Sequence, residues 1–205
     1  MRLALIVEYE GTAYSGFQYQ IDSPTVQEQL EQSITALTGE EIRVAAAGRT
    51  DSGVHALGQV VAFDTDTRHS TTTVLRAMNH WLPDDIAVKA AYRVAANFDP
   101  RRDAISRVYR YTVSTSSVRS PLRRRTTALV RERLDTGRMK KAAKLFEGVH
   151  DFALFGGPLE DPSASTVRQV FSARVRNRDE EIVIEVAGSA FLPRQVRRMA
   201  GALID

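Results

Sequence analysis

Cysteine is absent from the 205-residue sequence, tryptophan occurs once, and there is no long hydrophobic run. Without cysteine the chain forms no disulfide, has no thiol nucleophile and offers no thiolate to zinc. A membrane-spanning helix needs roughly 20 consecutive apolar residues, whereas the apolar run at the N-terminus is already interrupted at Glu8. These absences predict a globular protein that works in the reducing cytoplasm and has no membrane segment.

Lysine is also scarce, because 24 of the 28 basic residues are arginine and only four are lysine. Against 25 acidic residues this leaves a formal net charge of +3. The planar guanidinium group binds phosphate oxygens in pairs and stacks on bases, which the lysine ammonium does not. The skew therefore points to nucleic acid, although a GC-rich coding bias would produce the same enrichment, and composition alone leaves both interpretations open.

Common catalytic and cofactor motifs are missing as well. The four histidines, His55, His69, His80 and His150, form no HExxH or other closely spaced pair, so no metal site is expected. The sequence holds no GxxxxGK[ST] or GxGxxG loop, which argues against a bound nucleotide cofactor. A serine triad stays open, but the GxSxG turn that usually presents the serine is absent.

Hydrophobic periodicity divides the chain into two halves of similar element order. The first half predicts strand, helix, two strands, helix and strand, over residues 2–9, 26–38, 42–47, 58–64, 71–81 and 86–94. The second half predicts strand, helix, two strands and helix, over residues 107–114, 135–147, 166–176, 181–186 and 191–204. Proline at position 193 is tolerated in the first turn of that last helix.

This order predicts an α+β protein made of two ferredoxin-like or RRM-like βαββαβ units. We expect antiparallel sheets joined around a central cleft, with the second unit lacking its last strand. The expected domains are residues 1–97, which carry the loop described next, and residues 98–205, which look truncated. The open sheet face of such a unit is a common platform for RNA.

The densest cluster of chemically useful residues is Gly48–Val60, GRTDSGVHALGQV, between two predicted strands. Its glycines allow tight turns and close approach of a ligand, and Asp51 stands among them as a candidate nucleophile or base. The alternative is that Asp and Gly are simply turn residues. Taken alone, His55 indicates a packed or solvated histidine.

The same segment resembles the signature of the tRNA pseudouridine synthase A family. Further resemblances to that family follow in its order, at residues 14–20, 25–27, 79–86, 98–111, 148–152, 166–168 and 191–201. An ordered series covering nearly the whole chain is far more specific than one motif. Two features depart from the family: Pro193-Arg194-Gln195 replaces an aromatic residue, His and Met, and members typically continue past residue 205 with a helix and a closing strand.

The resemblance implies isomerisation of uridine to pseudouridine in the anticodon stem-loop of tRNA, at positions 38–40, by a homodimer without cofactor or metal. Asp51 matches the essential aspartate, which attacks C1′ of the sugar or helps to remove the C2′ proton. Arg197 matches its ion-pair partner, and Tyr109 matches the tyrosine that stacks on the uracil. The implied substrate-binding residues are Phe17, Gln18, Arg49, Thr50, His55, Arg107, Arg110 and Arg194.

Several alternatives stand beside these roles. Phe17 and Gln18 could simply pack their loop, and Arg198 is interpreted as a solvent or phosphate contact. The basic run Arg123–Arg125 is a candidate for tRNA phosphate. For the whole chain, the alternatives are a catalytically inactive RNA-binding paralogue or fragment, and a nucleoside hydrolase. The latter chemistry usually requires a second carboxylate or a metal.

Overall fold

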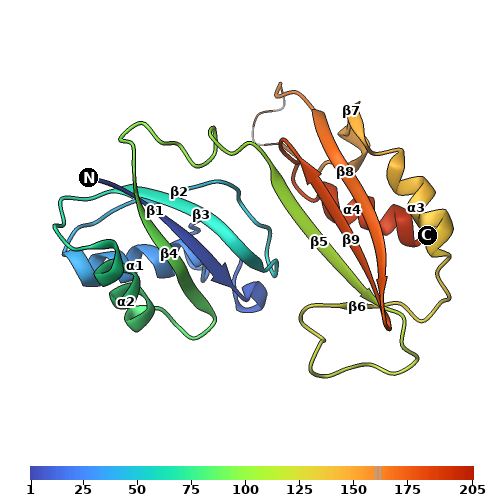
Figure 1. Ribbon diagram of the computed structural model, residues 1–205, viewed down its shortest axis with the longest axis horizontal. Helices are drawn as coiled ribbons and strands as arrows, with labels where there is room; N and C mark the ends of the chain where they lie inside the picture. The colour runs from blue at the N-terminus through green and yellow to red at the C-terminus, as the bar shows by residue number, and fades with distance from the viewer. Residues whose placement is uncertain (160, 162) are drawn as a thin grey trace. The chain divides into compact units, whose positions relative to one another are not determined.

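The computed structural model describes residues 1–159, 161 and 163–205 and divides into two compact units, unit 1 (Met1–Ala104) and unit 2 (Ile105–Asp205) (Figure 1). The elements of unit 1 are β1 Arg2–Tyr9, α1 Val26–Thr38, β2 Ala45–Ala46, β3 Ala56–Asp64, α2 Thr71–Trp81 and β4 Ile86–Val94. Those of unit 2 are β5 Arg107–Ser114, β6 Ala128–Leu129, α3 Thr136–Lys144, β7 Gly148–Asp151, β8 Val167–Arg178, β9 Glu181–Gly188 and α4 Gln195–Ile204. The predicted α+β class is confirmed.

Unit 1 has the predicted βαββαβ order. Its sheet runs β2-β3-β1-β4 with every neighbouring pair antiparallel. Alternate residues of β1 point to one face, where Leu3, Leu5 and Val7 are fully buried. Both helices contribute to the same core, through Leu30 of α1 and Met78 of α2, so the helices cover one face of the sheet and leave the other without a helix (Figure 1).

The helix ends of unit 1 follow the sequence signals. The Thr25 hydroxyl accepts a hydrogen bond from the backbone N–H of Glu28 at 3.3 Å, which caps α1. Gly39 ends that helix in the left-handed conformation, with φ of 74°. Ser70 caps α2 in the same way as Thr25 caps α1. These caps explain why both helices begin and end at the predicted residues.

Unit 2 is built on the same plan with additions. Its sheet runs β6-β5-β9-β8-β7, antiparallel except for the short parallel pair β5–β6. Its core contains Val113, Ile184 and Val186 from the strands, with Met139 of α3 and Met199 of α4. Both helices therefore pack on one face here too.

Several predicted elements differ from the structure. The strand expected over 42–47 is only Ala45–Ala46, and the helix expected over 135–147 ends at Lys144. Strands β6 and β7 were not predicted, because they are two and four residues long and β7 is fully exposed, so neither shows a hydrophobic pattern. The strands predicted to end at residues 176 and 186 extend as a hairpin to Arg178 and Gly188.

The last helix also begins later than predicted, at Gln195 instead of residue 191. Arg194 has a φ of 61°, in the left-handed region, which a helix cannot contain. The buried Gln195 side chain accepts the backbone N–H of Leu192 at 2.8 Å. Residues 191–194 therefore form a turn, with Pro193 before the helix instead of inside it.

Candidate active site

The loop that carries Asp51 joins β2 to β3 and is tied to the strand that follows it. The Gln59 side chain donates to the carbonyl oxygen of Gly48 at 2.7 Å, and the backbone N–H of Ala47 donates to Val60 at 2.8 Å. Within the loop, the N–H of Val54 donates to the carbonyl of Asp51 at 3.1 Å. The two ends of the loop are thereby held together beside β3.

A second segment, between β1 and α1, braces the loop from another side. The N–H of Phe17 donates to the Thr50 carbonyl at 3.0 Å. The Tyr14 carbonyl accepts two bonds, from the N–H of Gly53 at 3.3 Å and from the Ser52 hydroxyl at 3.2 Å. The residues on both sides of Asp51 are thus fixed by backbone hydrogen bonds, while Asp51 itself remains half-buried.

Two glycines permit this close approach. A Cβ on Gly11 would lie 2.0 Å from the carbonyl oxygen of Val54. A Cβ on Gly16 would lie 2.9 Å from the carbonyl oxygen of Thr50, and the φ of Gly16 is +105°. Only glycine fits either position without moving the backbone of the Asp51 loop.

Two tyrosines connect this assembly to the sheet. The Tyr9 hydroxyl lies 2.7 Å from the Thr50 hydroxyl. The Tyr14 hydroxyl, which is buried, donates to Oδ1 of Asp85 at 2.6 Å, next to the start of β4. Burial and the neighbouring Asp85 carboxylate raise the pKa of Tyr14 above its ordinary value. Tyr14 therefore remains the neutral hydrogen-bond donor at physiological pH.

His55 also connects the segment between β1 and α1 to the Asp51 loop. Its Nδ1 accepts the backbone N–H of Gly11 at 3.0 Å. The Glu10 carboxylate lies 3.6 Å from Nδ1. The ring orientation is therefore set by the protein, and this histidine holds the Asp51 loop whatever else it contacts.

Of the other site residues predicted in unit 1, Phe17 is 1% exposed and packs in the core, with its ring centroid 6.2 Å from that of Tyr9. This placement fits the alternative that Phe17 packs its loop, and a role for Phe17 in substrate binding stays a prediction. Gln18 and Arg49 are exposed, and Thr50 is half-buried beside Tyr9.

In unit 2 the predicted residues lie at the start of β5 and before α4. Arg107 donates to the carbonyl oxygen of Ser189 at 2.6 Å. The ring of Tyr109 meets that of Phe191 edge-on, with centroids 5.2 Å apart. Because side chains alternate along a strand, Tyr109 and Tyr111 share the face that carries the core, and Arg110 points to the opposite face. There Arg110 lies 3.3 Å from Glu185.

The turn before α4 is fixed from within the core. Gln195, which is fully buried, holds Leu192 and contacts the Met199 sulfur at 3.7 Å. The exposed Arg197 and Arg194 thus extend from a rigid turn. Arg198, which is also exposed, donates to the carbonyl oxygens of Leu154 and Gly156, and its expected contact with phosphate stays a prediction.

Sequence reasoning missed the supporting roles of Tyr9, Gln59, Asp85 and Gln195. Asp85 and Gln195 stand in recognised motifs, so their position was visible but their hydrogen bonds were not. Gln59 could have been noticed as a polar residue in a strand that is otherwise apolar, where a buried amide requires partners.

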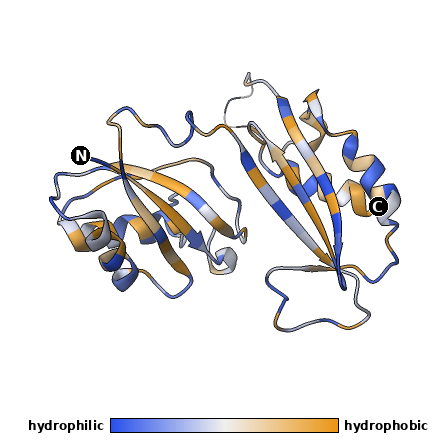
Figure 2. Ribbon diagram, in the orientation of Figure 1, coloured by the Kyte–Doolittle hydropathy of each residue, from blue (hydrophilic) through white to orange (hydrophobic). Residues whose placement is uncertain are grey.

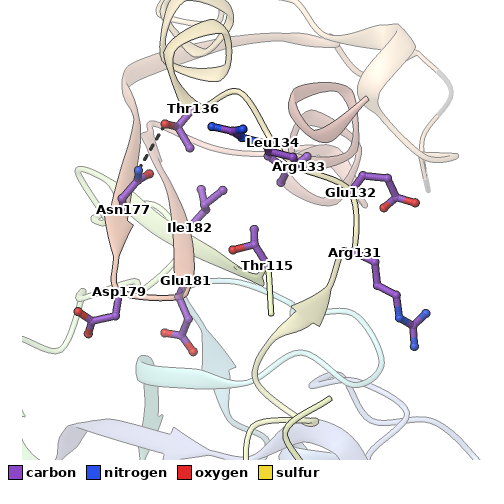
Figure 3. A pocket seen from close by; sticks show the side chains of 10 residues that line it. All are labelled: Thr115, Arg131, Glu132, Arg133, Leu134, Thr136, Asn177, Asp179, Glu181 and Ile182. Atoms are coloured by element: carbon purple, nitrogen blue, oxygen red, sulfur yellow. Dashed lines mark hydrogen bonds between the residues drawn. The ribbon is translucent and has the colours of Figure 1, made fainter. Parts of the chain in front are cut away.

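A separate hollow of about 420 Å³ lies at the end of the β8–β9 hairpin (Figure 3). Its lining mixes Arg131 and Arg133 with Glu132, Asp179 and Glu181. Thr115, which follows β5, also lines it and is six residues from Tyr109, about 20 Å along a strand. None of the predicted site residues borders this hollow.

Neither a cluster of metal-binding side chains nor a membrane-spanning helix occurs in residues 1–159, 161 and 163–205.

Comparison with known proteins bears directly on these residues. A family model described as tRNA pseudouridine synthase matches residues 5–101 and 142–205. Asp51 and Arg197 lie inside the matched ranges, and Tyr109 lies between them. Proteins named tRNA pseudouridine synthase A are similar over nearly the whole chain. The relative from Pelobacter propionicus is 43% identical over 203 residues, which is 99% of this chain and 83% of its own length.

Two further relatives give the same picture. The protein from Geotalea uraniireducens is 42% identical over all of this chain and 83% of its own length. The one from Roseiflexus castenholzii is 44% identical over 99% of this chain and 76% of its own length. The chain belongs to the tRNA pseudouridine synthase family.

Proposed function

We propose that this protein isomerises uridine to pseudouridine in the anticodon stem-loop of tRNA, without a cofactor, in the cytoplasm and as a homodimer. Family membership supports the reaction and the RNA class. The observation that carries the assignment to a site is the Asp51 loop, which is held by hydrogen bonds on both sides of the aspartate. A fixed, partly exposed carboxylate is what a reaction at the sugar carbon requires.

The reaction breaks one bond and forms another. The N1–C1′ bond of uridine is cleaved, the uracil turns, and its C5 joins C1′; the C5 proton leaves and N1 gains a proton. Asp51 acts either by attacking C1′, which gives a covalent ester that C5 then displaces, or by helping to remove the C2′ proton. Both routes use the same carboxylate, and neither consumes an oxidant, a reductant or a metal.

Two residues of unit 2 serve this carboxylate and the base. Arg197 matches the family's arginine and supplies the positive charge that a reacting carboxylate requires. Tyr109 stacks on the target uracil, and its ring is already held edge-on against Phe191. A uridine within a stem must first be flipped out, which costs a few kcal/mol of stacking and pairing, so contacts with the rest of the tRNA must supply binding energy.

The remaining proposed contacts bind RNA around the target. Arg49, Thr50 and His55 lie on or beside the Asp51 loop, and Gln18 lies on the segment that braces it. In unit 2 the proposed contacts are Arg107, Arg110, Arg194 and the run Arg123–Arg125. Within that run, Arg123 is paired with Glu181 at 2.9 Å.

The test is to incubate the purified protein with tRNA labelled with tritium at C5 of uridine and to measure tritium release, then to map pseudouridine. We expect release from wild type, with the new pseudouridines confined to the anticodon stem-loop. Binding without release identifies the inactive RNA-binding alternative, and free uracil among the products identifies a hydrolase. Light scattering of the purified protein tests the dimer.

A further inference from the structure

The sheet of unit 2 has one face that neither of its described helices covers. Met139 of α3 and Met199 of α4 both pack with Ile184 of β9, so both helices lie on the same side of the sheet. Side chains that alternate with the core residues point to the opposite side. Figure 2 shows the resulting alternation of hydrophilic and hydrophobic residues along β8 and β5.

Arginines line this helix-free face. Val175 is 5% exposed and belongs to the core, whereas its neighbours Arg174 and Arg176 are exposed and point the other way, followed in the same phase by Arg178. Alternate residues of a strand are about 7 Å apart, so the three guanidinium groups form a regular row, called here the β8 arginine row. Register places Glu185 between Arg174 on β8 and Arg110 on β5.

The carboxylates of this face are occupied by other groups. Glu185 pairs with Arg110 at 3.3 Å and Glu181 pairs with Arg123 at 2.9 Å. Glu147 accepts bonds from Lys144 and from the N–H of Ala173, and it also interacts electrostatically with Arg174. Within the described residues no carboxylate forms an ion pair with the β8 arginine row. Asp179 and Glu180 follow Arg178 in the hairpin turn. The row of basic residues therefore ends at two acidic residues.

The chemistry of the face fits a phosphodiester backbone and not stacked bases. RRM sheets bind bases through aromatic side chains on their central strands, whereas the corresponding positions of β5 and β9 hold Thr112 and the buried Val183. The exposed aromatic residue Phe171 lies at the bulge of β8. Guanidinium groups at regular spacing match phosphate oxygens, which they bind in pairs.

We propose that the helix-free face of unit 2, along the β8 arginine row, is a second binding surface for the phosphate backbone of tRNA. It is separate from the residues that act on uridine, because Tyr109 points to the other face of the same sheet. The inference rests on the proposed function, since it takes tRNA as the substrate. It supplies contacts with the tRNA body that offset the cost of flipping the uridine.

The test compares two variants that each lose three positive charges. One is Arg174→Gln/Arg176→Gln/Arg178→Gln, and the matched control is Arg138→Gln/Lys140→Gln/Lys141→Gln, on exposed positions of α3, which packs on the other side of the sheet. The dissociation constant for a full-length tRNA is measured over a series of salt concentrations, and thermal melting confirms that both variants fold.

Each lost phosphate contact lowers the slope of log K against log salt by about 0.9. We expect the row variant to lose about 2 to 3 from the slope and the control to lose less than about 1. Equal slopes for both variants, or no change in either, would overturn the proposal. Tritium release by the wild type with the same tRNA is read separately: its absence contradicts the proposed function, whereas activity with equal slopes contradicts only this surface.

Discussion

The two units have related sheets but hold their candidate site residues in different ways. In unit 1 the Asp51 loop is fixed by backbone bonds to Tyr14, Phe17 and Val60 and leaves no space for a Cβ at Gly11. In unit 2 Arg197 is exposed on the first turn of α4, and the ring of Tyr109 packs edge-on against that of Phe191. A reacting carboxylate must be placed within a fraction of an ångström, whereas a stacking ring and a counter-ion tolerate adjustment.

The sheets differ at the corresponding edge. In unit 1 the strand that follows the second helix, β4, pairs with β1 along its whole length. Within the described residues of unit 2, the equivalent side of β5 is paired at Val113 and Ser114, by the two-residue β6. Because the Asp51 loop of unit 1 is held by several backbone hydrogen bonds, substitutions in the segment that holds it are expected to have the larger effects.

The largest effect on stability is expected from Gly11→Ala. Its Cβ would overlap a backbone oxygen that cannot move without the Asp51 loop, so we expect a loss of about 3 kcal/mol or more, at the upper end of overpacking costs, together with loss of pseudouridine formation. Chemical unfolding and tritium release measure the two effects.

Gly39→Ala is the matched control, since its φ is +74° but nothing lies within 4 Å of the new Cβ. Left-handed strain alone costs about 1 to 2 kcal/mol. If Gly11→Ala is no more destabilising than this control, the close contact described between Gly11 and the Asp51 loop does not exist.

A smaller effect is expected from breaking the Tyr14–Asp85 bond. Tyr14→Phe removes a hydrogen bond to a charged acceptor, worth about 1.5 to 3 kcal/mol, and loosens the carbonyl that holds Ser52 and Gly53. We expect a lower kcat with a nearly unchanged KM for tRNA. A double-mutant cycle with Asp85→Asn isolates the pair: strictly additive losses would show that the two side chains do not act together.

The raised pKa of Tyr14 makes the stability of the protein depend on pH. Burial and Asp85 raise the pKa of Tyr14 above its unfolded value, which is about 10. Above that pH the folded state retains a proton that the unfolded state has lost, so stability falls as pH rises. In Tyr14→Phe this part of the decline in stability should disappear. Unfolding curves collected from neutral to alkaline pH measure the difference.

The smallest effect is expected in unit 2, from Gly201→Ala in α4. Nothing lies within 4 Å of the new Cβ, and alanine in a helix interior is about 0.5 to 1 kcal/mol more stable than glycine. We expect a melting temperature a few degrees higher. A lower melting temperature would mean that α4 is packed more tightly than described.

The sequence predicts interactions between neighbouring residues better than interactions between residues that are far apart in the chain. The boundaries of α1 and α2 were predictable because caps such as Thr25 and Gly39 act locally. The two-residue strands were not, because neighbouring strands and not their own side chains define them. The start of α4 was mistaken because one buried side chain, Gln195, holds the preceding turn.

The candidate site shows the same division. Asp51, Tyr109 and Arg197 stand in motifs and could be named in advance. The hydrogen bond from Tyr14 to Asp85 joins residues 71 positions apart, and no spacing rule connects them. Phe17 was assigned to substrate binding because it matches the family motif, and the motif does not reveal that its side chain is buried in the core of unit 1.

The central claim is that the Asp51 loop supplies the reacting carboxylate, and Asp51→Asn tests it most directly. The amide keeps the size of the side chain but removes its charge and nucleophilicity. With tRNA bound at saturation, the rate of pseudouridine formation in a single turnover is compared with wild type. The account predicts unchanged folding and a rate lower by at least about 1000-fold. A rate within about ten-fold of wild type would contradict it.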